Sequence, residues 1–139
     1  MKAVILAGGL GTRLRPFTEV IPKPLLPVGE SSVLEIQILS LKQAGFSEIY
    51  IATNYKADYV KAFLGDGSKY DLKLYFSQER EPLGTCGPLA LLREELDSLF
   101  ILMNGDILTN LSGSIRRLPD NRMILVYRHI LSIAIHLTS

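Results

Sequence analysis

Three glycines within four positions, Gly8, Gly9 and Gly11, follow a short apolar run at residues 3–7. The run has the composition of a strand that is buried on both faces. Glycines at the end of such a strand let the backbone turn sharply and leave N–H groups free to bind an anion. Arg13 adds a planar cation that can bind two phosphate oxygens. The pattern predicts a phosphate-binding loop, with a tight strand-to-helix turn as the alternative.

The common phosphate-binding motifs do not match this loop. A dinucleotide fingerprint beginning at Gly9 needs a glycine at position 14, where the chain has Leu14. A P-loop needs Gly-Lys followed by Ser or Thr, and the chain contains no such sequence. The loop is therefore expected to bind phosphate in another way.

A second cation follows the loop. Lys23 stands between Pro22 and Pro24, so its local backbone is stiff and its ammonium group has little freedom. Two restrained cations after one glycine-rich loop suit a polyphosphate ligand. The alternative for Lys23 is a solvated lysine in a loop.

Short apolar runs alternate with helical patterns from the start of the chain to about position 110. Ser32 and Glu35 form a capping-box pattern that begins a helix ending near Gly45. Asn54 is expected to cap a second helix, which ends at Gly65 and turns Val60, Phe63 and Leu64 inward. Further strands are predicted at residues 48–53, 72–76 and 99–103, and a further helix at residues 85–96 with Pro88 in its first turn.

This order predicts an α/β fold. Strands joined by helices favour right-handed crossovers, and hence a three-layer, Rossmann-like, mostly parallel sheet with helices on both faces. We expect residues 1–110 to form the nucleotide-binding half of a domain. Residues 111–139 are expected to be a divergent or truncated tail of edge strands, with one strand at residues 123–127 and an apolar stretch at 130–137.

Composition excludes several classes of protein. The 139 residues are 47% hydrophobic and carry a formal net charge of +1, so nothing indicates a nucleic-acid partner. One cysteine cannot form a disulfide framework. No apolar run approaches the roughly 18 residues that a membrane span needs, and no signal peptide is recognisable. We expect a cytoplasmic protein with no membrane partner.

The run LAGGLGTRLRPFTEVIPKPLLPV, residues 6–28, resembles the signature of the sugar-1-phosphate nucleotidylyltransferases, also called nucleotide-sugar pyrophosphorylases. The resemblance continues through LGDGS at 64–68, EPLGTCGPL at 81–89 and NGD at 104–106. It extends to about position 110 and is strongest toward the mannose-1-phosphate guanylyltransferases. It implies the fold of the nucleotide-diphospho-sugar transferases.

The resemblance implies transfer of a nucleotidyl group from a nucleoside triphosphate to a sugar 1-phosphate, with Mg²⁺ as cofactor and pyrophosphate as the second product. Arg13 and Lys23 would be catalytic, and Asp106 would bind the metal, although an aspartate in a turn is the alternative for Asp106. The residues implied to bind the nucleotide are Leu6, Ala7, Gly8, Gly9, Gly11, Thr12, Glu79, Gly84 and Thr85.

Glu79 bears on the choice of base. Thymidylyl and uridylyl members of this family typically carry glutamine there, which offers a donor and an acceptor. A carboxylate only accepts, which suits the two donors on the edge of guanine. We therefore favour GTP with mannose 1-phosphate, followed by glucose 1-phosphate with dTTP or UTP. Alternatively, Glu79 is solvated and Gln78 faces the base.

The tail departs from the family. The sugar-binding segment, a second metal-binding aspartate and a further phosphate-binding lysine have no counterpart after Leu111. The alternatives are therefore a non-catalytic nucleotide-binding or regulatory module, or an inactive fragment. The apolar tail could also pair two copies of the chain.

Overall fold

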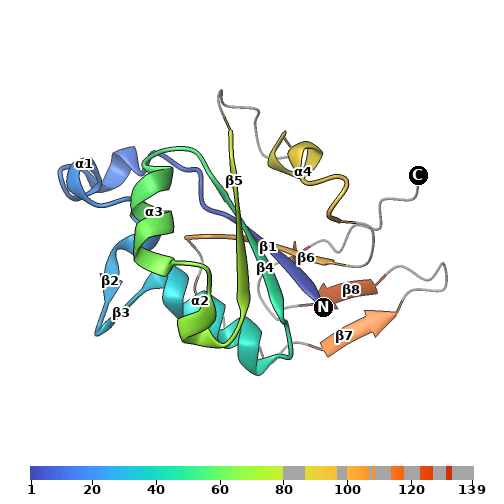
Figure 1. Cartoon of the computed structure of the whole chain (residues 1–139). Coiled ribbons are helices and arrows are strands. Elements are labelled where there is room, and N and C mark those ends of the chain that lie inside the picture. The colour runs from blue at the N-terminus through green and yellow to red at the C-terminus, as the bar shows by residue number, and fades with distance from the viewer. Residues whose placement is uncertain are drawn as a thin grey trace.

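The computed structural model describes residues 1–79, 87–96, 100–106 and 108, and the backbone of three further strands. Four strands form one parallel sheet in the order β5-β4-β1-β6. Their bounds are Lys2–Leu6 for β1, Glu48–Thr53 for β4, Lys73–Gln78 for β5 and Phe100–Asn104 for β6. The chain thus begins in the middle of the sheet and adds strands on both sides (Figure 1).

Strand β1 is hydrogen-bonded along its whole length on both sides. Lys2 lies opposite Glu48 of β4 and Phe100 of β6, and the same parallel register continues to Leu6. Ala3, Val4 and Ile5 are fully buried. This explains the uninterrupted apolar run, because the alternate side chains of a central parallel strand face two different hydrophobic layers.

Helices cover both faces of the sheet, as predicted. Helices α2 (Val33–Gln43) and α3 (Ala57–Leu64) lie on one face and α4 (Gly87–Leu91) lies on the other (Figure 1). Ile5 packs in the core under α2 and α3, whereas Val4 packs in a second cluster with residues of and after α4. The three-layer, mostly parallel α/β fold is therefore confirmed.

The capping box predicted at the start of α2 is present. The Glu35 backbone N–H donates to Ser32 Oγ at 3.2 Å, and the Ser32 N–H donates to Glu35 Oε2 at 3.1 Å. The Tyr70 hydroxyl donates to Glu35 Oε1 at 2.9 Å. Tyr70 belongs to a 3₁₀ turn, η3 (Ser68–Tyr70), just before β5, so α2 is fixed both by its own cap and by a distant segment.

The expected start of α3 was wrong. Asn54 does not cap this helix; Lys56 precedes it instead, with a left-handed φ of 54° and no side-chain cap. The Lys56 ammonium donates to the carbonyl oxygens of Glu19 and Val20, at the end of the short helix α1 (Phe17–Val20). The turn after β4 therefore bonds to another segment of the chain, which local propensity does not reveal.

The other predicted elements differ mainly at their ends. Phe63 was expected to face inward, but 46% of it is exposed, because the buried side of α3 is formed by Ala57, Val60 and Leu64. The described part of the predicted helix at 85–96 is helical over α4 and continues in turns, with Pro88 in the first turn.

The segment between β1 and α2 also holds η1 (Thr12–Leu14), η2 (Lys23–Leu25), β2 (Pro27–Val28) and β3 (Ser31–Ser32).

The strands that follow β6 pair only with one another in the described structure. Strands β7 (Ser114–Arg117), β8 (Met123–Val126) and β9 (Leu131–Ser132) form an antiparallel sheet of their own. Strand β8 confirms the strand expected at 123–127, whereas β7 was not predicted. The domain boundary near position 110 remains a prediction.

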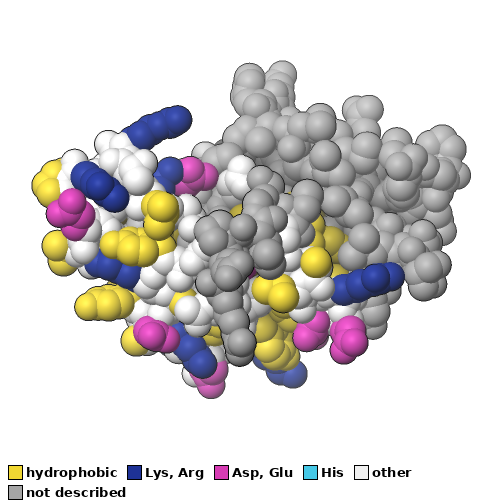
Figure 2. All heavy atoms as spheres, turned by 90° about the horizontal axis from the view of Figure 1, so that it is seen from above, with side chains coloured by type: hydrophobic (Ala, Val, Ile, Leu, Met, Phe, Trp, Pro, Cys, Tyr) yellow, Lys and Arg dark blue, Asp and Glu magenta, His cyan; other side chains and the backbone are white. Residues whose placement is uncertain are grey.

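The surface carries mixed charge. Figure 2 shows basic and acidic side chains interspersed over the described part of one face, in keeping with the net charge of +1. Within the described ranges, no helix is both long and apolar enough to cross a membrane.

Replacing Glu35 should destabilise the fold in a pH-dependent way. Burial raises the pKa of the Glu35 carboxyl, but hydrogen bonds from Ser32 and Tyr70 outweigh it and leave the pKa lowered. A carboxyl whose pKa is lowered by folding stabilises the native state above its unfolded pKa, and this contribution disappears as the pH falls through the folded pKa. We expect Glu35→Ala to cost about 1 kcal/mol at pH 7, the usual value of a helix cap, and less as the pH drops below about 4.

Urea denaturation of both proteins across this pH range measures the difference. Glu30→Ala is the matched control, since Glu30 is an exposed acid just before the same helix. An equal loss in both variants at pH 7 would contradict the role of the capping box.

Candidate active site

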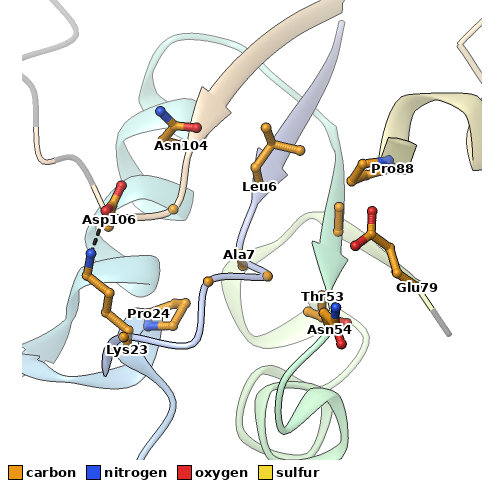
Figure 3. Close-up of a pocket in the computed structure, with 15 residues that line it drawn as sticks. Leu6, Ala7, Lys23, Pro24, Thr53, Asn54, Glu79, Pro88, Asn104 and Asp106 are labelled. Atoms are coloured by element: carbon orange, nitrogen blue, oxygen red, sulfur yellow. Dashed lines mark hydrogen bonds and ion pairs between the residues drawn. The ribbon is translucent and has the colours of Figure 1, made fainter. Parts of the chain in front are cut away.

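A cavity of about 470 Å³ opens at the carboxyl ends of the parallel strands (Figure 3). This is where ligands bind in open α/β sheets, because loops diverge there and leave a crevice. Residues from the ends of all four strands, from η2 and from α4 line it: Leu6, Ala7, Gly8, Gly9, Gly11, Lys23, Pro24, Ala52, Thr53, Asn54, Glu79, Pro88, Asn104, Gly105 and Asp106.

The end of β1 forms the floor of the cavity. The Ala7 N–H donates to the carbonyl of Ala52 at 2.7 Å, and the Gly105 N–H donates to the carbonyl of Leu6 at 2.8 Å. A Cβ at Gly105 would lie 2.9 Å from the Leu6 oxygen and 3.2 Å from Ala7 Cα, so only glycine allows this approach. The close approach brings Asp106 beside the glycine-rich loop that begins at Gly8.

Gly11 turns that loop back on itself. Its φ is 60°, and a Cβ there would lie 2.7 Å from Thr18 Cγ2 and 3.1 Å from Lys23 Cβ. Thr18 is buried, and its hydroxyl donates to the Gly11 carbonyl at 2.8 Å. Gly11 is therefore the point at which the loop, α1 and η2 pack together, and this packing carries Lys23 to the rim of the cavity.

Lys23 and Asp106 form an ion pair across the cavity mouth. Lys23 Nζ lies 2.5 Å from Asp106 Oδ2, although the residues are 83 positions apart in sequence (Figure 3). The two side chains are 32% and 43% exposed, so solvent screens the attraction and a ligand can reach both groups. The residues expected to bind phosphate and metal therefore lie side by side.

Glu79 lines the part of the cavity near α4, below Pro88 in Figure 3. It follows β5, and its backbone N–H donates to the Thr53 carbonyl at 3.1 Å. The residue is only 8% exposed, and its Oε1 has no hydrogen-bond partner among the described residues. A buried carboxylate oxygen without a donor is costly, so this oxygen can accept a hydrogen bond from a ligand.

Most of the predicted nucleotide-binding residues meet here. Of the sequence-predicted site, the cavity brings together Leu6, Ala7, Gly8, Gly9, Gly11, Lys23, Glu79 and Asp106. Thr12 and Arg13 are exposed on η1 and do not line it, and Gly84 and Thr85 lie outside the described residues.

Sequence reasoning missed Asn54 as a site residue because it interpreted this position as a helix cap. Asn54 follows β4, and a Cβ on Gly8 would lie 3.4 Å from Asn54 Cβ, so the two loops are in contact. Its position after β4 could have indicated this role, because the residues that follow parallel strands meet at one edge of the sheet, whatever their type.

The side chains at the cavity allow a metal site in which the protein supplies few ligands. Within the described ranges, no three His, Cys, Asp or Glu side chains converge as a metal-binding group. Two carboxylates line the cavity among the described residues, and Asp106, half-exposed beside Lys23, is the one at its mouth, whereas Glu79 is buried on the side of α4. That suits Mg²⁺, which commonly takes one or two carboxylates and completes its shell with phosphate oxygens and water.

Residues 2–119 match the model of the family described as "Nucleotidyl transferase", so this chain belongs to the nucleotidyl transferase family. Over 115 residues the chain is 47% identical to a protein of Oryza sativa subsp. japonica assigned as mannose-1-phosphate guanylyltransferase 1, a match that covers 78% of this chain and 32% of the relative. The chain thus spans about a third of the length of that curated relative.

Two solved structures share the fold. A protein of Bacillus anthracis assigned as a glucose-1-phosphate thymidylyltransferase, in complex with sucrose, superposes with a TM-score of 0.71 at 30% identity, covering 84% of this chain and 46% of that one. HddC from Yersinia pseudotuberculosis, complexed with GMP-PN, superposes with a TM-score of 0.69 at 26% identity. This match covers 97% of this chain and 73% of HddC.

Gly11 should tolerate no side chain. Gly11→Ala combines a left-handed φ with a contact that the buried Thr18 cannot relieve, and we expect a loss of about 2 kcal/mol or more. Gly9→Ala is the matched control, because a Cβ at Gly9 meets nothing within 4 Å. Its stability in urea denaturation should stay within about 0.5 kcal/mol of the wild type. Similar stabilities for the two variants would show that Gly11 does not fix the loop.

Proposed function

We propose that this chain forms the nucleotide-binding part of an enzyme that transfers a nucleotidyl group from a nucleoside triphosphate to a sugar 1-phosphate. The observation that carries the proposal is the cavity itself. A glycine-rich loop, a lysine and a carboxylate converge at the end of a central parallel strand. Membership of the nucleotidyl transferase family and the mannose-1-phosphate guanylyltransferase relative support this chemistry.

The reaction needs charge neutralisation more than acid–base catalysis. An oxygen of the sugar 1-phosphate attacks the α-phosphorus; a P–O bond forms there while the bond to the β-phosphate breaks, and pyrophosphate leaves with the electron pair. The attacking phosphate is already mostly ionised at pH 7, since its second pKa is about 6, so no general base is required. Positioning and electrostatics then supply most of the catalysis.

The residues divide these tasks. Backbone N–H groups of the loop containing Gly8 and Gly9 bind the phosphates, and Lys23 neutralises their charge. Arg13 lies two residues beyond Gly11, and its long side chain binds the polyphosphate from outside the present cavity. Asp106 holds Mg²⁺, which when bound lowers the charge repulsion around the phosphates.

Guanine is the proposed base. Its edge presents two donors, N1–H and N2–H₂, and the Glu79 carboxylate accepts at a buried position where Oε1 lacks a partner within the described structure. The relative assigned as a mannose-1-phosphate guanylyltransferase and the neighbour complexed with GMP-PN support this choice. We accordingly propose GTP and mannose 1-phosphate as substrates, Mg²⁺ as cofactor and the cytoplasm as location.

Titration calorimetry of GTP, dTTP, UTP and ATP with Mg²⁺ tests the proposal directly. Saturable binding with GTP preferred supports it, and the formation of GDP-mannose and pyrophosphate would establish transfer. Binding without transfer favours the alternative of a non-catalytic nucleotide-binding module. A folded chain that binds no triphosphate would overturn the assignment of this cavity.

Glu79→Gln should change the base preference. Glutamine offers one acceptor and one donor, so it loses a charge-assisted hydrogen bond to guanine and gains a match to uracil and thymine. A hydrogen bond to a charged group contributes about 1.5–3 kcal/mol, so GTP affinity should fall about tenfold or more while UTP affinity rises. Glu30→Gln, at an exposed site outside the cavity, is the control. Unchanged selectivity in Glu79→Gln would remove this residue from base recognition.

Arg13→Ala should abolish transfer and leave the fold intact. The side chain is exposed, so its removal creates no cavity in the core, and circular dichroism should be unchanged. Arg15→Ala is the matched control, an exposed arginine at the end of the same 3₁₀ turn, and it should keep its activity. Normal transfer by Arg13→Ala would show that the assigned role is wrong.

A further inference from the structure

A buried amide stands in the apolar face of α2. Gln37 is only 3% exposed, and its helical neighbours Leu34, Ile38 and Leu41 are fully buried in the core beneath the sheet. Burying an amide among such side chains is unfavourable unless it is hydrogen-bonded. A leucine or methionine would satisfy the packing of this helix, so packing alone does not account for a glutamine here.

The Gln37 amide bonds to the backbone of the site. Its Nε2 donates to the carbonyl oxygen of Asn104 at 2.8 Å, a contact between residues 67 positions apart. Asn104 is the last residue of β6 and lines the cavity, and Asp106 follows two residues later (Figure 3). The bond therefore ends on the backbone that carries the proposed metal-binding carboxylate.

Strand β6 needs such a support. Among the described residues, β6 is the edge strand of the four-stranded sheet and pairs with β1 alone. The last bond to β1 is that of the Gly105 N–H to Leu6. The amide of Gln37 holds the same peptide from the side of α2, and α2 is itself fixed through Glu35 to Ser32 and Tyr70.

We propose that Gln37 is a positioning residue for Asp106. It fixes the Asn104–Gly105 peptide between α2 and β1, and thereby holds the Asp106 carboxylate beside Lys23 and the bound phosphates. Gln37 touches no substrate in this role. The inference about Asp106 rests on the proposed function, whereas the anchoring of the β6 end does not.

Two variants of one helix separate positioning from packing. Gln37→Met keeps the length of the side chain and removes the donor. Leu41→Met makes a comparable change in the same core one turn further along, at a residue that does not line the cavity. Gln37→Asn, which keeps an amide but shortens its reach, is a second variant should Gln37→Met fail to fold.

Hydrogen exchange of the Gly105 amide is the first readout and needs no ligand. Gln37→Met should speed this exchange by roughly tenfold, the effect expected from losing one buried hydrogen bond. The Ala7 amide, which donates to Ala52 on the other side of β1, should exchange as in the wild type. Unchanged exchange at Gly105, or an equal increase in Leu41→Met, would overturn the proposal.

Metal-dependent binding is the second readout. Mutating a residue that supports a metal ligand typically lowers metal affinity about 10- to 100-fold. Gln37→Met should therefore weaken Mn²⁺ binding in the presence of GTP by about tenfold. Binding of GTP without metal should change less than about twofold, because the glycine-rich loop is unaffected. Equal losses of GTP affinity with and without Mn²⁺ would show that Gln37 has only a structural role and would overturn its role in positioning Asp106. If the wild-type chain binds no GTP, the proposed function fails, and the Gly105 exchange still decides whether Gln37 anchors β6.

Discussion

The parallel pairing of β1 with both of its neighbours is the constraint on which the site depends. Because the pairing continues to Leu6 and Ala7, the chain leaves the sheet at Gly8, and it does so between the ends of β4 and β6. The hydrogen bond from Gly105 to Leu6 closes the side toward β6 and is possible only without a Cβ. A side chain at position 105 would therefore disturb the floor of the cavity and the position of Asp106 together.

Much of this arrangement was predictable because its signals are local. The apolar run of β1, the bounds of β4 and the capping box of Ser32 and Glu35 follow from residue types at fixed short spacings. The prediction of a phosphate-binding loop at Gly8 rests on the same kind of local signal. The placement of Lys23 and Asp106 in one site followed from a resemblance that extends over both segments, since no local rule relates positions so far apart.

What could not be predicted depends on contacts between distant segments. Lys56 adopts a left-handed φ and bonds to the end of α1, so it displaced the expected cap at Asn54. Gln37 is an ordinary polar residue in a helical pattern, and only the position of Asn104 gives it a partner. The exposed position of Arg13 likewise depends on how the turn after Gly11 packs on Thr18.

The ion pair between Lys23 and Asp106 also has an electrostatic consequence for how ligands enter. Two opposite charges in contact cancel at a distance, so this rim is nearly electroneutral and exerts little long-range attraction on either a lone cation or a lone anion. A ligand that itself carries both signs, such as a phosphate chelated to a divalent ion, can exchange partners with the pair and leave no charge uncompensated. Ionic strength should therefore act weakly on the encounter at this rim, even though phosphates are highly charged.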